Sequence, residues 1–217
     1  MESLDEIKSR IEAAVPVAKI EIVQNGSSSQ QHSLLIDNEH AVAIARFLRV
    51  DPALCLDFCS NVTGVDWPDC VVKKTTKVKK VVDGQEKEIA ETTEEKIRGC
   101  LEAIYHLYSI THKHGPLIIR MRTGDRVDGT HLPSLTPIWR SAEFQEREIF
   151  DLYGIRFDGH PDLRRILMWD EFENYPMRKD YCEPDDYEWE PTPHDEVLEK
   201  TKMHYTPRPA EEELKPF

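Results

Sequence analysis

The run from Glu143 to Gly154 constrains the fold more than any other part of this sequence, because it reads as one helix with two different faces. Pro137 suits the first turn of a helix, and Gly154 suits the left-handed position at which helices end. At about 100° per residue the apolar side chains fall on one stripe, which predicts that the helix packs against a sheet. The stripe consists of Trp139, Ala142, Ile149, Phe150 and Tyr153.

Charged residues on the same helix are expected to form a ladder. Glu143, Arg147 and Asp151 follow one another at steps of four residues, with Arg140 alongside. Surface pairs at this spacing stabilise a helix by only about 0.3–0.5 kcal/mol each. This ladder is therefore expected to be a solvated face unless something docks on it.

Glu146 is different because it falls inside the apolar stripe. An unpaired carboxylate there would cost several kcal/mol, so we expect a cationic partner or an interface. Arg164 and Arg165 are the expected partners, since the turn at 158–161 can send the chain back along the helix. A structural clamp is the preferred role for Glu146, ahead of contact with a partner and of catalysis.

Composition excludes several classes of function. The formal net charge of −13 leaves no excess of basic residues to neutralise phosphates, which argues against nucleic acid and against an anionic membrane surface. No apolar run approaches the roughly 20 residues that span a bilayer. The acidic start resembles neither a secretory signal nor a transit peptide, and the five cysteines are scattered, so we expect a soluble, intracellular chain with reduced thiols.

The first part of the chain alternates between helix and strand signals. Ser3 and Glu6 form a capping box that predicts a helix, and Asn38 is suited to cap a second one. The predicted strands are 18–23, 33–36, 54–65, 101–110 and 117–122. This order predicts an α+β fold, in which a mixed β-sheet carries helices on one face and is followed by an extended C-terminal arm.

Two segments differ in composition from this core. Residues 72–98 are Lys-rich and then Glu-rich around Asp83-Gly84, which favours a solvated insertion but also allows a protruding hairpin. Residues 171–217 hold 14 acids and 6 bases, with many prolines, and cannot bury enough apolar area to fold alone. We therefore predict a core domain over 1–165, which includes the insertion, and an acidic, Pro-rich, partner-wrapping arm over 166–217.

No recognised catalytic motif occurs in the sequence. His112 and His114 would share one face of a strand, as in some metal sites, but two histidines without a third ligand are weak evidence. A freestanding acid–base or metal-dependent enzyme would have to use Glu146, Asp151 and the histidines. This enzyme is kept as the alternative from another functional class.

Residues 146–168, followed by Pro176-Met-Arg-Lys-Asp-Tyr181, closely resemble the signature of one family. This is the 30-kDa subunit family of NADH:quinone oxidoreductase (respiratory complex I), whose bacterial members are called the C subunit. Residues 62–66 and 101–107 resemble it more loosely, and the resemblance covers most of 15–181.

The resemblance implies a structural and assembly subunit in the peripheral arm of a proton-pumping complex that moves electrons from NADH to quinone. Such a subunit has no catalytic residues, cofactor or metal of its own. FMN, iron–sulfur clusters and quinone belong to partner subunits, and the expected partners are the large quinone-site (D) subunit and the adjacent iron–sulfur (B and I) subunits. The location implied is the cytoplasmic side of the bacterial inner membrane, with no direct membrane span.

Two alternatives share this kind of role: the equivalent subunit of a membrane-bound hydrogenase-type complex, and an adaptor outside respiration. The residues expected to fix the arm and the interface are Glu146, Arg147, Asp151, Arg164, Arg165, Arg178, Lys179 and Asp180.

Overall fold

The computed structural model describes residues 2–82 and 85–182, with the backbone alone described over 73–93. The chain divides into two compact units, and the description below concerns the first, Met1–Tyr181. The predicted boundary at residue 165 separates a core domain that folds independently from an arm that does not, and contacts within the chain do not test this. It stays a prediction.

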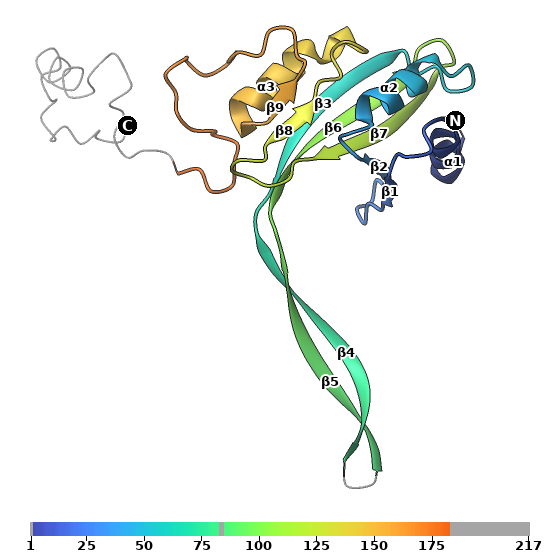
Figure 1. The fold of residues 1–217 in the computed structure, drawn as a ribbon, viewed down its shortest axis with the longest axis vertical. Helices are drawn as coiled ribbons and strands as arrows, with labels where there is room; N and C mark the ends of the chain where they lie inside the picture. The colour runs from blue at the N-terminus through green and yellow to red at the C-terminus, as the bar shows by residue number, and fades with distance from the viewer. Residues whose placement is uncertain (1, 83–84, 183–217) are drawn as a thin grey trace, which may run out of the picture. The chain divides into compact units, whose positions relative to one another are not determined.

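A five-stranded sheet forms the centre of this unit (Figure 1). Its strand order is β1-β2-β7-β6-β3, and β2 pairs with β7 in parallel while the other neighbours are antiparallel. The sheet is therefore mixed, as the sequence predicts. The strands are β1 (Ile20–Val23), β2 (Ser33–Ile36), β3 (Phe58–Trp67), β6 (Cys100–Ser109) and β7 (His114–Arg122).

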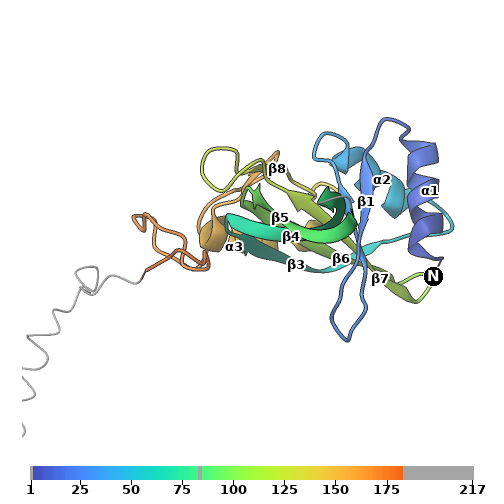
Figure 2. The ribbon, with the colours of Figure 1, turned by 90° about the horizontal axis from the view of Figure 1, so that it is seen from below.

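All three α-helices lie on one face of this sheet, as Figure 2 shows. Along β6, Leu101, Ala103 and Tyr105 are fully buried against the helices, and the alternate residues point to the opposite face. The fold is thus α+β with helices on one face, which confirms the predicted class. The helices are α1 (Leu4–Ala14), α2 (Ala41–Val50) and α3 (Glu143–Tyr153).

The local signals at the first two helices have different outcomes. The capping box before α1 is present, because Ser3 and Glu6 bond each other's backbone N–H groups. At α2 the prediction of an Asn38 cap is wrong: the N-cap is His40, and the Asn38 side chain donates to the carbonyl of Arg122 in β7. The Asn38 side chain therefore makes a long-range hydrogen bond to the sheet instead of capping the helix.

The strand predicted from residue 54 begins later, at Phe58. The N–H groups of Leu54 and Cys55 both bond the carbonyl of Asp51, so a turn extends beyond α2. Cys55 also has a positive φ of 42°, which lies outside the range of strand residues.

The charged insertion forms a hairpin in its backbone. Strand β4 (Cys70–Val82) pairs antiparallel with β5 (Gln85–Ile97), in register from Cys70 opposite Ile97 to Val82 opposite Gln85. The two strands form a sheet of their own and continue outward from β3 and β6 (Figure 1). The backbone thus adopts the hairpin that the sequence allows, and the solvated character of the insertion stays a prediction.

Helix α3 begins later than Pro137 indicates. A short 3₁₀-helix, η1 (Arg140–Ala142), precedes it, and Ala142 is the N-cap of α3. Its end is as predicted, because Gly154 has φ 78° at the C-cap. A two-stranded parallel sheet of β8 (His131–Pro133) and β9 (Arg156–Asp158) lies beside it.

Candidate functional site: the clamp around helix α3

Glu146 is fully buried and bonded to neutral groups. Its carboxylate accepts from the Tyr105 hydroxyl at 3.0 Å and from the Leu135 N–H at 2.9 Å. The hydroxyls of Ser134 and Thr136 donate to the other oxygen at 2.6 and 3.0 Å. Burial raises the pKa of Glu146 above its usual value, and these four donors oppose the rise.

The expected arginine partner of Glu146 is therefore a wrong prediction. Arg164 pairs with Asp162 at 2.9 Å, and Arg165 pairs with Asp151 at 2.7 Å. The turn that places Ser134 to Thr136 over β6 supplies enough donors to satisfy the buried carboxylate without a cation. Glu146 thus joins α3 to β6 and to this turn within the chain.

Asp151 is the carboxylate that meets the returning segment. One of its oxygens accepts the consecutive backbone N–H groups of Ile166, Leu167 and Met168, at 3.0, 2.7 and 2.9 Å. The other accepts the guanidinium of Arg165. Burial by itself would raise the pKa of Asp151, but these donors outweigh it and the pKa lies below its ordinary value.

Arg147 holds the same segment one turn earlier on α3. Its guanidinium donates to the carbonyls of Arg164 and Arg165 at 3.2 and 3.3 Å. Arg147 is 6% exposed and Asp151 is fully buried. Residues 164–168 dock on this part of the ladder, which is the condition under which the sequence does not predict a solvated face, while Arg140 stays exposed.

Arg178 fixes the next part of the arm to the end of α3. It donates to the carbonyl of Tyr153 at 2.7 Å and to the carbonyl of Arg126 at 2.8 Å, and it stacks over Tyr175 at 4.6 Å. A Cβ on Gly154 would lie 2.6 Å from the Tyr175 ring and 2.7 Å from Arg178 Nη2. The glycine thus both ends the helix and makes room for the arm.

The last described part of the arm reaches the end of β3. Asp66 is 3% exposed and receives two bonds from Arg126, at 2.7 and 2.8 Å, together with the backbone N–H of Lys179 at 2.8 Å. Arg126 also bonds Asp180 at 2.9 Å. Sequence reasoning missed Asp66 and Arg126, because neither has a local pattern that indicates a contact with the arm.

We call this set of contacts the clamp. It contains four of the eight residues predicted from the sequence, and Lys179 and Asp180 contact it through Asp66 and Arg126. Glu146 lies in the core, and Arg164 is largely exposed. The clamp consists of Asp66, Arg126, Arg147, Asp151, Arg165 and Arg178.

The arm carries exposed apolar side chains on the side away from the clamp. Ile166 is 39% exposed and Leu167 is 58% exposed, although their N–H groups point inward to Asp151. Trp169 and Met177 are 43% and 53% exposed. Large apolar groups held outward on an ordered backbone are typical of protein interfaces.

The two carboxylates named for the enzyme alternative are engaged within the chain, and the histidine pair named with them lies elsewhere. Glu146 and Asp151 are both fully buried and saturated by donors of the same chain. The rings of His112 and His114 stack with centroids 5.8 Å apart, and His112 Nε2 contacts the carbonyl oxygen of Pro52. Asp151 belongs to the clamp and Glu146 lies in the core, and no described contact joins either carboxylate to this histidine pair.

No helix within the described ranges, 2–82 and 85–182, combines the length and the apolar character needed to cross a bilayer.

Residues 34–187 match the family model described as respiratory-chain NADH dehydrogenase, 30 Kd subunit. The chain is similar to the C 2 subunit of NADH-quinone oxidoreductase from Rhizobium meliloti, with 37% identity over 72% of this chain and 69% of the relative. It is also 36% identical to the C subunit of NADH-quinone oxidoreductase from Saccharopolyspora erythraea, over 67% of this chain. That match spans 47% of the relative, about half of its length.

One similar solved structure belongs to the membrane-bound sulfane sulfur reductase, an archaeal respiratory membrane complex. The TM-score is 0.55 at 19% identity, and the match covers 99% of this chain and 98% of the other. At this level of identity the likeness concerns the fold.

Proposed function

The chain belongs to the 30-kDa subunit family of respiratory-chain NADH dehydrogenase, and we propose that it is a structural and assembly subunit of the complex. In this role it carries no flavin, iron–sulfur cluster or quinone and performs no chemistry. It supports electron transfer from NADH to quinone by holding the quinone-site subunit in position. FMN, the clusters and the quinone reside in partner subunits.

The observation that carries this proposal is the clamp with its outward apolar side chains. Ordering a segment on a partner costs conformational entropy, and a segment that is already fixed avoids most of that cost. Asp151 fixes three consecutive N–H groups of the arm, while Ile166 and Leu167 face outward. These features support a pre-ordered docking surface as the role of the clamp.

The proposed partners are the large quinone-site (D) subunit and the adjacent iron–sulfur (B and I) subunits. The proposed location is the cytoplasmic side of a bacterial inner membrane, where the chain is bound through the complex without spanning the bilayer. The names of the relatives, which are C subunits of NADH-quinone oxidoreductase, support this assignment.

Purification of the tagged chain from its native cells in mild detergent tests the proposal. Co-purification with flavin-bearing and iron–sulfur subunits is the expected result, and mass spectrometry would identify the docking partner. Recovery with a hydrogenase module in place of the NADH-oxidising subunits would favour the related hydrogenase-type assembly. A stable, colourless monomer without partners would overturn both.

Variants of the arm separate docking from chemistry. Leu167→Asp places a charge on the exposed apolar surface without removing a clamp contact, so it should lower the amount of assembled complex. Complex that does form should keep its turnover per flavin. Val127→Asp is a matched control, because Val127 is 79% exposed and lies outside the arm. Equal assembly in both variants would contradict a docking role for Leu167.

A further inference from the structure

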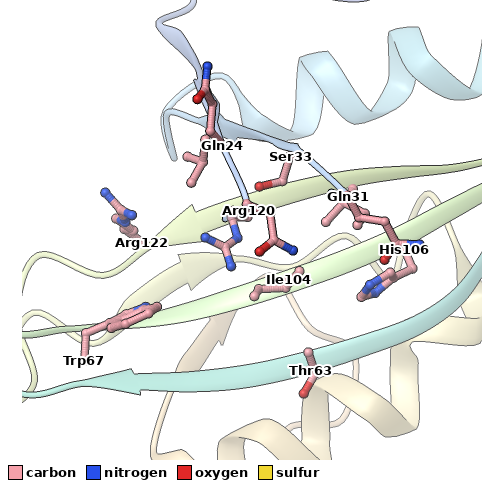
Figure 3. Close-up of a pocket in the computed structure, with 12 residues that line it drawn as sticks. Gln24, Gln31, Ser33, Thr63, Trp67, Ile104, His106, Arg120 and Arg122 are labelled. Carbon is pink, nitrogen blue, oxygen red and sulfur yellow. The ribbon is translucent and has the colours of Figure 1, made fainter. Parts of the chain in front are cut away.

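The face of the sheet away from the helices carries a hollow of about 410 Å³. Figure 3 shows this face, with Arg120 and Arg122 on β7, His106 on β6 and Trp67 on β3. Gln31, from the connection between β1 and β2, leans over the same space. The clamp belongs to the helix-covered side, and the arm meets the hollow at one end, where Lys179 Nζ lies 5.6 Å from the centre of the Trp67 ring.

This face contains buried polar atoms that the chain itself does not satisfy. Within the described residues, four buried side-chain atoms have no hydrogen-bond partner. Glu102 Oε2, His106 Nδ1 and Arg120 Nε belong to the middle of this sheet, and His114 Nδ1 lies at the start of β7. A buried polar group left unpaired costs about 1–3 kcal/mol, and most proteins leave few of them. Their concentration on one sheet face indicates a surface that a further molecule completes.

The charges on this face favour an anion. Glu102 is fully buried, and its Oε1 accepts a hydrogen bond from Arg122 Nε. Arg120 Nη1 lies 3.6 Å from Glu102 Oε2. Two guanidinium groups thus share this one carboxylate, and Arg122 also lines an adjacent hollow with Glu21 and Lys19. Burial lowers the pKa of His106, so its ring is neutral at pH 7 and adds no further positive charge.

The shape of the site favours a polypeptide over a small free anion. Ile104 and Ile118 form an apolar floor beside the arginines, and Trp67 is 44% exposed at one end. Gln31 offers an amide that can donate to a backbone carbonyl or accept from an N–H. An extended segment that carries one carboxylate would meet both the arginines and the apolar floor.

We propose that this face of the sheet binds an acidic side chain on an extended segment of another subunit of the complex. The proposal rests on the proposed function, because it requires a neighbouring subunit. It adds a second contact surface, opposite the clamp, that recognises a carboxylate through Arg120 and Arg122.

Site-specific photo-crosslinking in the assembled complex tests the proposal. A benzophenone amino acid replaces Gln31 at the rim, and the same group replaces Arg46 on α2 as a control on the helix-covered side. The expected product joins position 31 to a segment of another subunit that contains Asp or Glu. Three outcomes would overturn the proposal: no crosslink in intact complex, a crosslink to residues 183–217 of the same chain, or a partner segment without an acid.

Charge variants provide the second measurement. Arg122→Gln should lower the crosslink yield at position 31 by about tenfold, since a desolvated charge pair contributes at least about 1.4 kcal/mol to binding. Glu102→Gln frees both arginines and should raise the yield, which a merely unfolded variant would not do. Arg46→Gln removes the same charge on α2 and should leave the yield unchanged.

The results separate the two proposals. If the tagged chain recovers no other protein of the complex, the proposed function fails. If the complex is recovered intact but neither the crosslink nor its dependence on Arg122 is found, this inference alone fails.

Discussion

The backbone N–H of Lys179 donates to the carboxylate of Asp66 at 2.8 Å, although the two residues are 113 positions apart. Arg126 holds the same carboxylate with two bonds and also pairs with Asp180. The end of β3 and the last described part of the arm are therefore fixed to each other.

Asp66→Asn should release this part of the arm. The substitution removes the charge that Arg126 binds, and breaking a buried pair costs about 3–5 kcal/mol. Trypsin should then cleave after Arg178 and Lys179 about tenfold faster or more, as measured by mass spectrometry over time. Asp128→Asn, at an exposed position near Arg126, is the control. Equal cleavage in the two variants would show that Asp66 does not hold the arm.

Asp151→Asn should lower the free energy of unfolding by about 2–4 kcal/mol, because the amide presents an N–H₂ group to donors and loses the ion pair with Arg165. Urea denaturation measures the change. Glu148→Gln changes an exposed acid on the same helix and should stay within about 0.5 kcal/mol of the parent. A similar small change for Asp151→Asn would contradict the clamp.

The two buried acids of α3 should affect stability in opposite directions with pH. The pKa of Asp151 is lowered in the folded state, so its stabilisation is present above about pH 4 and is lost as the pH falls through the folded pKa. The pKa of Glu146 is raised, so stability decreases as the pH rises above about 4.5. Unfolding free energies measured from about pH 3 to 7 should show a shallower acid decline in Asp151→Asn. An unchanged slope below about pH 4 would refute the assignment.

Gly154→Ala should be more destabilising than Gly159→Ala. Both glycines have positive φ, 78° and 81°, so each substitution costs about 1–2 kcal/mol in backbone strain. At Gly159 a Cβ meets nothing within 4 Å, whereas at Gly154 it meets Tyr175 and Arg178. The difference in unfolding free energy between the two variants isolates the contact with the arm. Equal costs would mean that the arm moves aside freely.

A pair of double-mutant cycles tests which of the two acids forms the ion pair with Arg165. Asp151→Asn and Arg165→Gln should couple by about 1 kcal/mol or more, because the two side chains are in contact at 2.7 Å. Glu146→Gln and Arg165→Gln should add within about 0.5 kcal/mol, since the structure places no bond between them. Urea denaturation of each set of single and double variants gives the values. Coupling in the second cycle would restore the pairing that the sequence predicts.

Local patterns predicted most of the fold. The capping box of Ser3 and Glu6 starts α1, and Gly154 ends α3, because capping uses backbone groups only a few residues away. The strand signals along 101–110 and 117–122 predicted β6 and β7. Patterns that compete with long-range contacts failed, as at Asn38, whose side chain bonds a carbonyl in β7.

The sequence by itself determined the family, the α+β class and the concentration of charged residues around α3, since each depends on residue types at fixed spacings. The tertiary structure alone decided which charges meet. Glu146 and Asp151 lie on the same helix, yet their hydrogen-bond donors differ. Glu146 accepts hydrogen bonds from hydroxyl groups, whereas Asp151 accepts them from Arg165 and from three backbone N–H groups. The physical reason is that hydrogen bonds require contact within about 3 Å. The path of the returning chain, and not its composition, brings donors to one carboxylate or the other.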